Sequence, residues 1–186
     1  MPRFHFVSTP LPGLQCVERL LLEDHRGYLS RLFCAEEFSA AGFAMSVAQI
    51  NHTLTRPPGT VRGLHFQLPP FAEMKLVTCI RGRVFDVAVD LRAGSPSFLR
   101  WHGEILSPDN RRALAIPQGF AHGFQALELD CELLYLHSAP YSSDAERALN
   151  PCDPRLAIHW PLPTVNLSER DRKHAMLTEE FKGIVL

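Results

Sequence analysis

Short runs in which apolar and polar residues alternate recur along the chain, bounded by residues typical of turns. The clearest are Lys75–Ile80 and Arg83–Leu91, with Arg81 and Gly82 between them. A period of two is typical of half-buried strands, and the two-residue gap predicts a β-hairpin. Similar runs follow at residues 98–106, 111–117, 122–127 and 131–138. Regularly spaced short strands predict a mainly β fold, either an antiparallel sandwich or a barrel.

The run 84–91 separates into two faces with different chemistry, because alternate residues of a strand point to the same side. One face is apolar and carries Phe85, Val87, Val89 and Leu91. The other carries Val84, Asp86, Ala88 and Asp90. The pattern therefore predicts one face for a hydrophobic core and one lined partly by carboxylates.

Helical signals are few. Residues 34–43 predict a short helix ended by Gly42, and residues 167–177 predict another that begins at Ser168. From about Asn150 the chain is rich in proline and is expected to wrap irregularly over the barrel. We expect residues 1–186 to form a single domain, because no repeat, low-complexity tract or linker divides them.

Composition and charge restrict the kinds of partner and the compartment that the chain suits. The net charge of −1 provides no basic surface for nucleic acid and no polybasic segment for a membrane. Five cysteines without CxxC spacing argue against a disulfide framework and for a reducing compartment. No apolar run approaches a signal peptide or a membrane span, so the chain is predicted to be cytoplasmic.

The stretch TVRGLHFQLPP places Arg62 and His65 in a strand-like run, with Gly63 between them. In a regular strand their side chains would point to opposite faces. A glycine inside a strand often marks a bulge, and a bulge here would turn both side chains toward one cavity. The alternative is an exposed arginine and a core histidine.

The stretch IPQGFAHGF contains P-x-G-x-x-H and resembles the second sequence motif of the cupin superfamily, whose fold is a small jelly-roll β-barrel. Many cupins bind a metal through the histidine of this motif, here His122, and through two histidines and a glutamate of a first motif. Gln67 occupies the place of the second histidine, and Glu73 is farther away than the usual spacing. The donor set disfavours a metal cofactor.

Without a metal, these residues suit proton abstraction beside a ketone. Imidazole is the side-chain group suited to proton abstraction at neutral pH, so His65 can act as the base. The enolate that forms needs cations or donors around its oxygen, and Lys75, Arg62 and His122 are candidates. Tyr135 lies in an apolar strand and could donate a proton to the opposite face of the carbon.

Successive blocks resemble the dTDP-4-dehydrorhamnose 3,5-epimerase family: GTVRGLHFQ, MKLV, GRVFDVAVDLRAGSPSF, ILSPDNRRALAIPQGFAHGF, CELLYLHS and LSERDR. The resemblance runs in order from about Asp24 to Asp171. It implies a metal-free cupin that epimerises carbons flanking the 4-keto group of a nucleotide-linked 6-deoxyhexose, with no cofactor. It implies these roles: His65 as base, Asp171 as its partner, Lys75 as enolate clamp, Tyr135 as proton donor and His122 as second active-site histidine. We also expect Asp86 to orient His122.

The resemblance also implies substrate-binding positions: Arg62, His122, Arg26, Tyr28, Gln49, Asn51, Tyr141 and Glu146. Family members are typically homodimers with exchanged N-terminal strands, so Arg26 and Tyr28 are expected to serve the neighbouring subunit. Two departures are Arg31, where many members carry an acid, and the LPPFAEM stretch before Lys75. Both concern substrate identity more than reaction type.

Simpler explanations exist for single residues. Ser168-x-x-Asp171 is also a helix-capping pattern. Asp90 and Glu104 are expected to face solvent or to form surface pairs. The remaining histidines are expected to be structural or surface residues: His5, His25, His52, His102, His137, His159 and His174.

The sequence as a whole predicts a nucleotide-sugar epimerase acting at C3, at C5 or at both. The alternatives are a metal-dependent cupin enzyme and a sugar-nucleotide binding protein without turnover.

Overall fold

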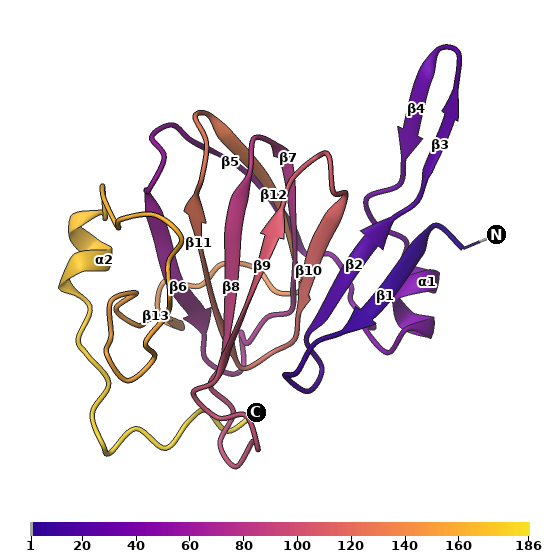
Figure 1. Ribbon diagram of the computed structural model, residues 1–186. Coiled ribbons are helices and arrows are strands. Elements are labelled where there is room, and N and C mark those ends of the chain that lie inside the picture. Colours follow the sequence, from indigo (N-terminus) through magenta and orange to yellow (C-terminus); the bar gives the residue numbers. More distant parts are fainter. Residues whose placement is uncertain (1) are drawn as a thin grey trace.

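The computed structural model describes residues 2–186, in which two antiparallel sheets face each other (Figure 1). The six-stranded sheet contains, in spatial order, β1 (Phe4–Ser8), β2 (Gln15–Arg19), β10 (Arg112–Ile116), β7 (Lys75–Arg81), β12 (Cys131–His137) and β5 (Gln49–Thr55). The five-stranded sheet contains β13 (Glu146–Ala148), β6 (Val61–Gln67), β11 (Phe120–Ala126), β8 (Val84–Asp90) and β9 (Trp101–Leu106). The predicted mainly β, cupin-type jelly-roll barrel with a few short helices is confirmed.

The predicted hairpin between the two clearest runs is wrong. β7 pairs with β10 and β12, whereas β8 pairs with β11 and β9 in the opposite sheet. The tight type I′ hairpin needs positive φ at both central residues, and here Gly82 has φ of +73° while Arg81 is not among the residues with positive φ. The Arg81–Gly82 pair therefore turns the chain from one sheet to the other.

The two faces predicted for β8 are confirmed. Val84 and Ala88 pack between the sheets, against residues such as Phe124 and Leu133. The opposite face contributes Val87, Val89 and Leu91 to a second cluster. That cluster includes Leu156 and Ile184, so the segment after Asn150 covers the outside of the five-stranded sheet as expected.

Both predicted helices are present but shorter. α1 (Ala35–Ala40) is followed by Gly42 with φ of +81°, and its Phe38 is fully buried against Phe4 and Phe6. α2 (Glu169–Lys173) begins at Ser168, whose Oγ accepts a hydrogen bond from the Asp171 amide at 3.0 Å. No helix within residues 2–186 is long and apolar enough to cross a membrane.

Asp90 is buried, which corrects its predicted surface position. Its Oδ2 accepts hydrogen bonds from the Arg92 guanidinium at 2.7 Å and from the hydroxyls of Ser95 and Ser97 at 2.6 Å each. The sequence could not reveal this, because the partners lie in the turn that folds back on the strand end. Glu104 forms the expected pair, with Arg112 at 2.7 Å.

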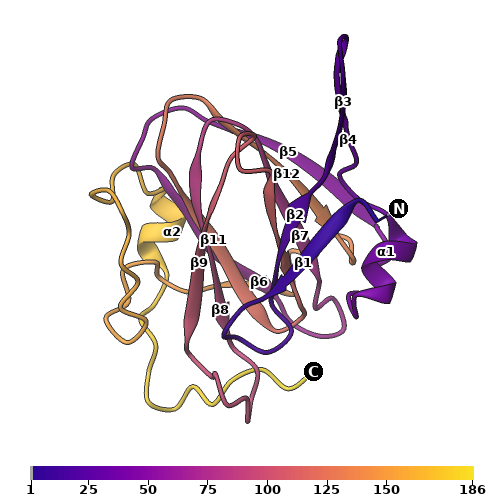
Figure 2. The ribbon, with the colours of Figure 1, turned by 45° about the vertical axis from the view of Figure 1, so that its right-hand side comes forward.

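A separate hairpin of β3 (Leu21–Asp24) and β4 (Gly27–Ser30) projects from the body of the molecule (Figures 1 and 2). Several of its apolar side chains are exposed: Leu22, Tyr28 and Leu29. This projecting hairpin is called the arm below.

Candidate active site

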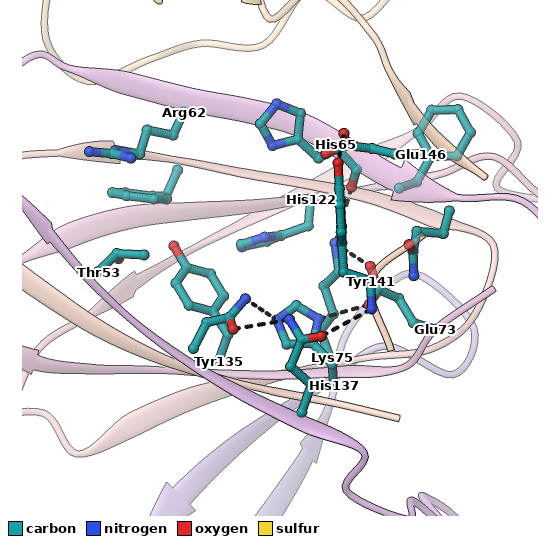
Figure 3. Close-up of a pocket in the computed structure, with 15 residues that line it drawn as sticks. Thr53, Arg62, His65, Glu73, Lys75, His122, Tyr135, His137, Tyr141 and Glu146 are labelled. Atoms are coloured by element: carbon teal, nitrogen blue, oxygen red, sulfur yellow. Dashed lines mark hydrogen bonds and ion pairs between the residues drawn. The ribbon is translucent and has the colours of Figure 1, made fainter. Parts of the chain in front are cut away.

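A cavity of about 290 Å³ lies between the two sheets and opens to solvent (Figure 3). Side chains from β5, β6, β7, β11 and β12 line it. It gathers most of the residues predicted from the sequence: Arg62, His65, Lys75, His122, Tyr135, Gln49, Asn51, Tyr141 and Glu146. Asp171 and Asp86 stand behind two of these side chains, and Arg26 and Tyr28 lie elsewhere.

A bulge in β6 explains why Arg62 and His65 share this cavity. His65 faces His122 and Arg62 faces Phe124 across the β6–β11 ladder, so two residues oppose the single Gly123. Gly63 has φ of +125°, and a Cβ at this position would lie 2.5 Å from the Gly123 Cα. The close backbone approach requires glycine, and the predicted bulge and common cavity are confirmed.

His65 is held from behind by Asp171. Its Nε2 lies 2.8 Å from Asp171 Oδ1, and the carboxylate is buried while the imidazole keeps 30% of its side-chain surface exposed. Burial alone would raise the pKa of Asp171, but the hydrogen bond and charge of His65 lower it below its usual value. An ionised partner on Nε2 leaves Nδ1 as the nitrogen that can take a proton. The backbone amide of Asp171 therefore takes part in the helix cap, while its carboxylate contacts His65.

His122 has a carboxylate of its own. Its Nε2 lies 2.8 Å from Asp86 Oδ1, and both side chains are buried. Burial raises the pKa of Asp86, although the charges of His122 and Lys75 act in the opposite direction. This geometry is the one that an orienting role for Asp86 requires. The role itself remains a prediction.

Tyr135 enters the cavity from the opposite sheet. It lies on β12, and its ring is 5.7 Å from that of His122 in an edge-on arrangement. Burial, with a further contribution from the charge of Asp86, raises the pKa of the phenol, so Tyr135 stays protonated at neutral pH. Figure 3 shows the hydroxyl of Tyr135 and the ring of His65 on opposite sides of the cavity.

Lys75 belongs to a buried cluster that the sequence did not predict. Its Nζ lies 3.1 Å from Glu73 Oε1, and His137 Nδ1 lies 2.8 Å from Glu73 Oε2. Burial would raise the pKa of Glu73, but its bond to His137 and the charge of Lys75 lower it. The expectation that His137 is merely structural is corrected, because it lines the cavity. Its position two residues after Tyr135 on one strand was the available signal.

Hydrogen bonds tie the rim of the cavity together. Gln49 Oε1 accepts from the Tyr141 amide at 3.0 Å, and the Tyr141 hydroxyl donates to Glu146 at 3.1 Å. Arg170, absent from the predicted set, donates to the other oxygen of Glu146 at 2.8 Å. Tyr141 as a residue is 58% exposed, so its ring is accessible for stacking on a flat ligand group.

Arg26 and Tyr28 are not brought to this cavity. Both lie on the arm, where Arg26 donates to Asp24 and Tyr28 is exposed. Arg31 contacts Glu37 of its own chain at 3.0 Å, so the charge reversal noted there is balanced locally.

The ligand set of a metal-dependent cupin is not assembled. Across residues 2–186, only His65, Asp171 and His174 form a group of at least three histidine, cysteine or carboxylate ligand atoms within 4.8 Å of one another. His122 is outside this group, and the Gln67 amide donates to backbone carbonyls of Phe71 and Pro140. His174, expected to be structural or at the surface, lies 3.7 Å from Asp171.

Comparisons with known proteins agree with the geometry. The family model described as dTDP-4-dehydrorhamnose 3,5-epimerase matches residues 8–179. A dTDP-4-dehydrorhamnose 3,5-epimerase of Sinorhizobium fredii is 41% identical over 180 residues, covering 96% of this chain and 92% of the relative. A dTDP-4-dehydrorhamnose 3-epimerase of Streptomyces niveus is 41% identical over 157 residues, covering 84% of this chain and 75% of the relative.

Among solved structures, an epimerase from Legionella pneumophila in complex with dTDP-4-keto-L-rhamnose superposes with a TM-score of 0.88. It is 36% identical in sequence, and the match covers 93% of this chain and 92% of that chain. The family resemblance expected from the sequence is thereby confirmed.

Proposed function

The chain belongs to the dTDP-4-dehydrorhamnose 3,5-epimerase family of isomerases, and on that premise we propose that it epimerises a dTDP-linked 4-keto-6-deoxyhexose through His65 and Tyr135. The observation that carries the proposal is the placement of a carboxylate-bound imidazole and a neutral phenol on opposite sheets of one cavity. An inversion needs a base on one face of the carbon and an acid on the other.

The first step is proton abstraction. Nδ1 of His65 takes the proton from a carbon next to the ketone, and the C–H electron pair becomes the double bond of an enolate. Asp171 stabilises the resulting imidazolium, as a buried carboxylate does in other His–Asp pairs. Negative charge moves to the former ketone oxygen, where the cations of Lys75 and Arg62 stabilise it.

The second step returns a proton from the other side. The Tyr135 hydroxyl donates to the face opposite His65, the double bond closes back to the ketone, and the configuration at that carbon is inverted. The phenolate then regains a proton from water, and the imidazolium loses one. Nothing in this sequence of transfers requires an oxidant or a reductant.

Deuterium incorporation tests the proposal. In heavy water the wild type is expected to place deuterium at C3, at C5 or at both, and His65→Asn is expected to abolish the incorporation. Tyr135→Phe is expected to retain exchange with unchanged configuration while inverted product falls, because abstraction survives and opposite-face delivery does not. Undiminished incorporation in His65→Asn would overturn the assignment.

The same experiment separates the remaining alternatives. A binding protein without turnover would hold the sugar nucleotide and incorporate no deuterium. The relatives include both a 3,5-epimerase and a 3-epimerase. The number of carbons that this chain inverts is read from the NMR signals at C3 and C5.

The arm supports a homodimer. Tyr28 and Arg26 are exposed and lie outside the cavity of their own chain, whereas the substrate proposed here has a nucleotide that a cavity of about 290 Å³ does not enclose with the sugar. We propose that the arm of one subunit reaches the cavity of its partner. In such a dimer the nucleotide contacts both chains. We also propose that the enzyme works in the cytoplasm, as the sequence predicts.

A further inference from the structure

Three side chains with metal-binding atoms converge behind the cavity: His65, Asp171 and His174. Asp171 Oδ1 lies 2.8 Å from Nε2 of His65 and 3.7 Å from Nε2 of His174. All three ligand atoms lie within 4.8 Å of one another. One carboxylate oxygen is therefore shared by two imidazoles, although the proposed reaction uses only one of them.

His174 lies beside the pair of His65 and Asp171 without a hydrogen bond, its ring edge-on to that of His65 with centroids 6.3 Å apart. Its Nε2 is buried and makes no hydrogen bond among the described residues, and 3.7 Å to Asp171 is too long for one. Its backbone is fixed, because Asn150 Nδ2 donates to the His174 carbonyl at 3.1 Å. A buried ring nitrogen held beside a carboxylate without a bond is an incomplete site.

We propose that His65, Asp171 and His174 bind a divalent transition-metal ion, with Zn²⁺ as the best fit, and that this ion inhibits the enzyme. Two imidazoles and one carboxylate are the donors that such ions prefer, and a fourth position stays open for water. Zinc bonds of about 2.0–2.1 Å in a tetrahedron place ligand atoms about 3.3 Å apart. The three atoms reach that spacing through side-chain shifts on the order of 1 Å.

An ion can approach two of the three ligands, His65 and Asp171, without entering the substrate cavity, while His174 lies beneath them. A second surface hollow is lined by His65 and Asp171 together with Asn166 and Ser168. Arg62 and Arg170 also line it, so the binding energy has to come from the ligand bonds and not from the surrounding charge. Arg170 is already paired with Glu146.

Inhibition follows from the proton on His65, and this part rests on the proposed function. The proposed mechanism places the single proton of the neutral His65 ring on Nε2, facing Asp171, so that Nδ1 is free to accept a proton. A metal on Nε2 shifts that ring proton to Nδ1, because a neutral imidazole has one N–H. The nitrogen that should act as the base is then already protonated. The ion would therefore suppress abstraction without occupying the sugar's place.

The test measures Zn²⁺ binding and activity separately. The full chain, stripped of metal and dialysed, is titrated with ZnCl₂ by calorimetry, and Co²⁺ is added in parallel because its visible absorption reports tetrahedral nitrogen ligation. We expect one site per chain, and His174→Ala and His174→Gln should each weaken Zn²⁺ binding at least roughly tenfold. His159→Ala, a change at an exposed histidine, is the matched control and should leave the affinity unchanged.

Activity provides the second readout. Zn²⁺ should inhibit deuterium incorporation by the wild type at the concentration at which it binds, and EDTA should restore it. The two His174 variants should need a correspondingly higher concentration for the same inhibition, relative to their own metal-free rates. Unchanged Zn²⁺ affinity in both variants would overturn the site. Binding that depends on His174 without effect on the rate would overturn only the inhibition. A chain that never turns over still reports on the site through calorimetry and the Co²⁺ spectrum.

Discussion

At the scale of residues, two imidazoles on neighbouring strands are each held by a carboxyl group, yet the pKa values of the two carboxyl groups shift in opposite directions. The pKa of Asp171 is lowered by His65, whereas burial raises the pKa of Asp86 beside His122. An ionised carboxylate stabilises an imidazolium, and a carboxyl with a raised pKa does so less. His65 is also the more exposed of the two histidines. These differences favour His65 as the base and a positioning or binding role for His122.

Replacing Asp171 with asparagine isolates the role of its charge. Asp171 does not line the cavity, so Asp171→Asn should leave KM close to that of the wild type. The kcat should fall roughly 10²–10⁴-fold, because the imidazolium loses its counter-charge and the ring its preferred tautomer. Glu169→Gln, a change at an exposed residue of the same helix, is the control for the helix itself. A large rise in KM with constant kcat would contradict this role.

At the scale of elements, the bulge in β6 sets the geometry of the site. It places two residues of β6 opposite one of β11, so Arg62 and His65 line the same cavity instead of pointing apart. Gly63 makes the bulge possible, since its Cβ position is occupied by the backbone of Gly123 and lies 2.8 Å from the His122 carbonyl oxygen. Glycine thus supplies, where the chemistry is expected, a backbone conformation that residues with a Cβ rarely adopt.

Gly63→Ala should therefore destabilise the fold far more than the same change at a glycine that has positive φ but open space around it. We expect it to reduce the free energy of unfolding by roughly 3–5 kcal/mol, from the positive φ and the backbone clash together. Gly94→Ala is the matched control: its φ is +74° and no atom lies within 4 Å of the added Cβ. Its cost should be about 1–2 kcal/mol, from φ alone. Urea unfolding of both variants measures the difference, and equal losses would refute the close approach as the cause.

The turn after β8 is held by Asp90. Burial would raise the pKa of this carboxyl, but the hydrogen bonds from Arg92, Ser95 and Ser97 lower it to about 2. A carboxyl whose folded pKa is lowered adds stability that is present above its unfolded value and is lost as the pH falls through the folded value. The lowering from 3.8 corresponds to about 2 kcal/mol.

Asp90→Asn should therefore lower the free energy of unfolding at pH 7 by at least about 2 kcal/mol. The difference from the wild type should shrink as the pH falls from about 4 toward 2. In this range the carboxyl of the unfolded wild type takes up a proton, while that of the folded protein is still largely ionised. Urea titrations at several pH values measure it. Asp109→Asn removes an exposed carboxylate and should show neither effect. A gap between Asp90→Asn and wild type that stays constant down to pH 2 would count against the ionised network.

At the scale of the whole molecule, the arm is the part of the chain that projects away from the two facing sheets. Within residues 2–186 its two strands pair only with each other, and Leu22, Tyr28 and Leu29 are exposed. Exposed apolar side chains on a projecting hairpin are typical of a segment that packs on another subunit. The proposed dimer places them there and delivers Arg26 to the partner's nucleotide.

Mixing two inactive variants tests this exchange. Arg26→Ala should impair the contact that the arm makes with the partner's cavity, and His65→Asn removes the base from its own cavity. In a heterodimer one cavity has both defects and the other has neither. After equal mixing and exchange of subunits, activity should return to about a quarter of the wild-type value. Light scattering checks that dimers form, and activity that stays at the sum of the separate variants would exclude sharing of sites between subunits.

The sequence by itself determined strands β6 to β12, the two faces of β8, the capped turn at Ser168 and the place of the glycine in the bulge of β6. These features are marked by residues a few positions apart, so the alternation of residues, a capping serine and a glycine inside a strand suffice to predict them. The order of the family blocks also determined which residues to examine for chemistry.

Only the tertiary structure decided which strands pair. β7 and β8 are adjacent in the chain and lie in opposite sheets, because pairing is settled by long-range burial of both strands and the intervening glycine does not impose a tight hairpin. The same long-range contacts bring His137 to Glu73, Arg170 to Glu146, and the turn that carries Asp171 and His174 to His65. A side chain's partners across the barrel depend on how distant segments pack, and no local pattern records that packing.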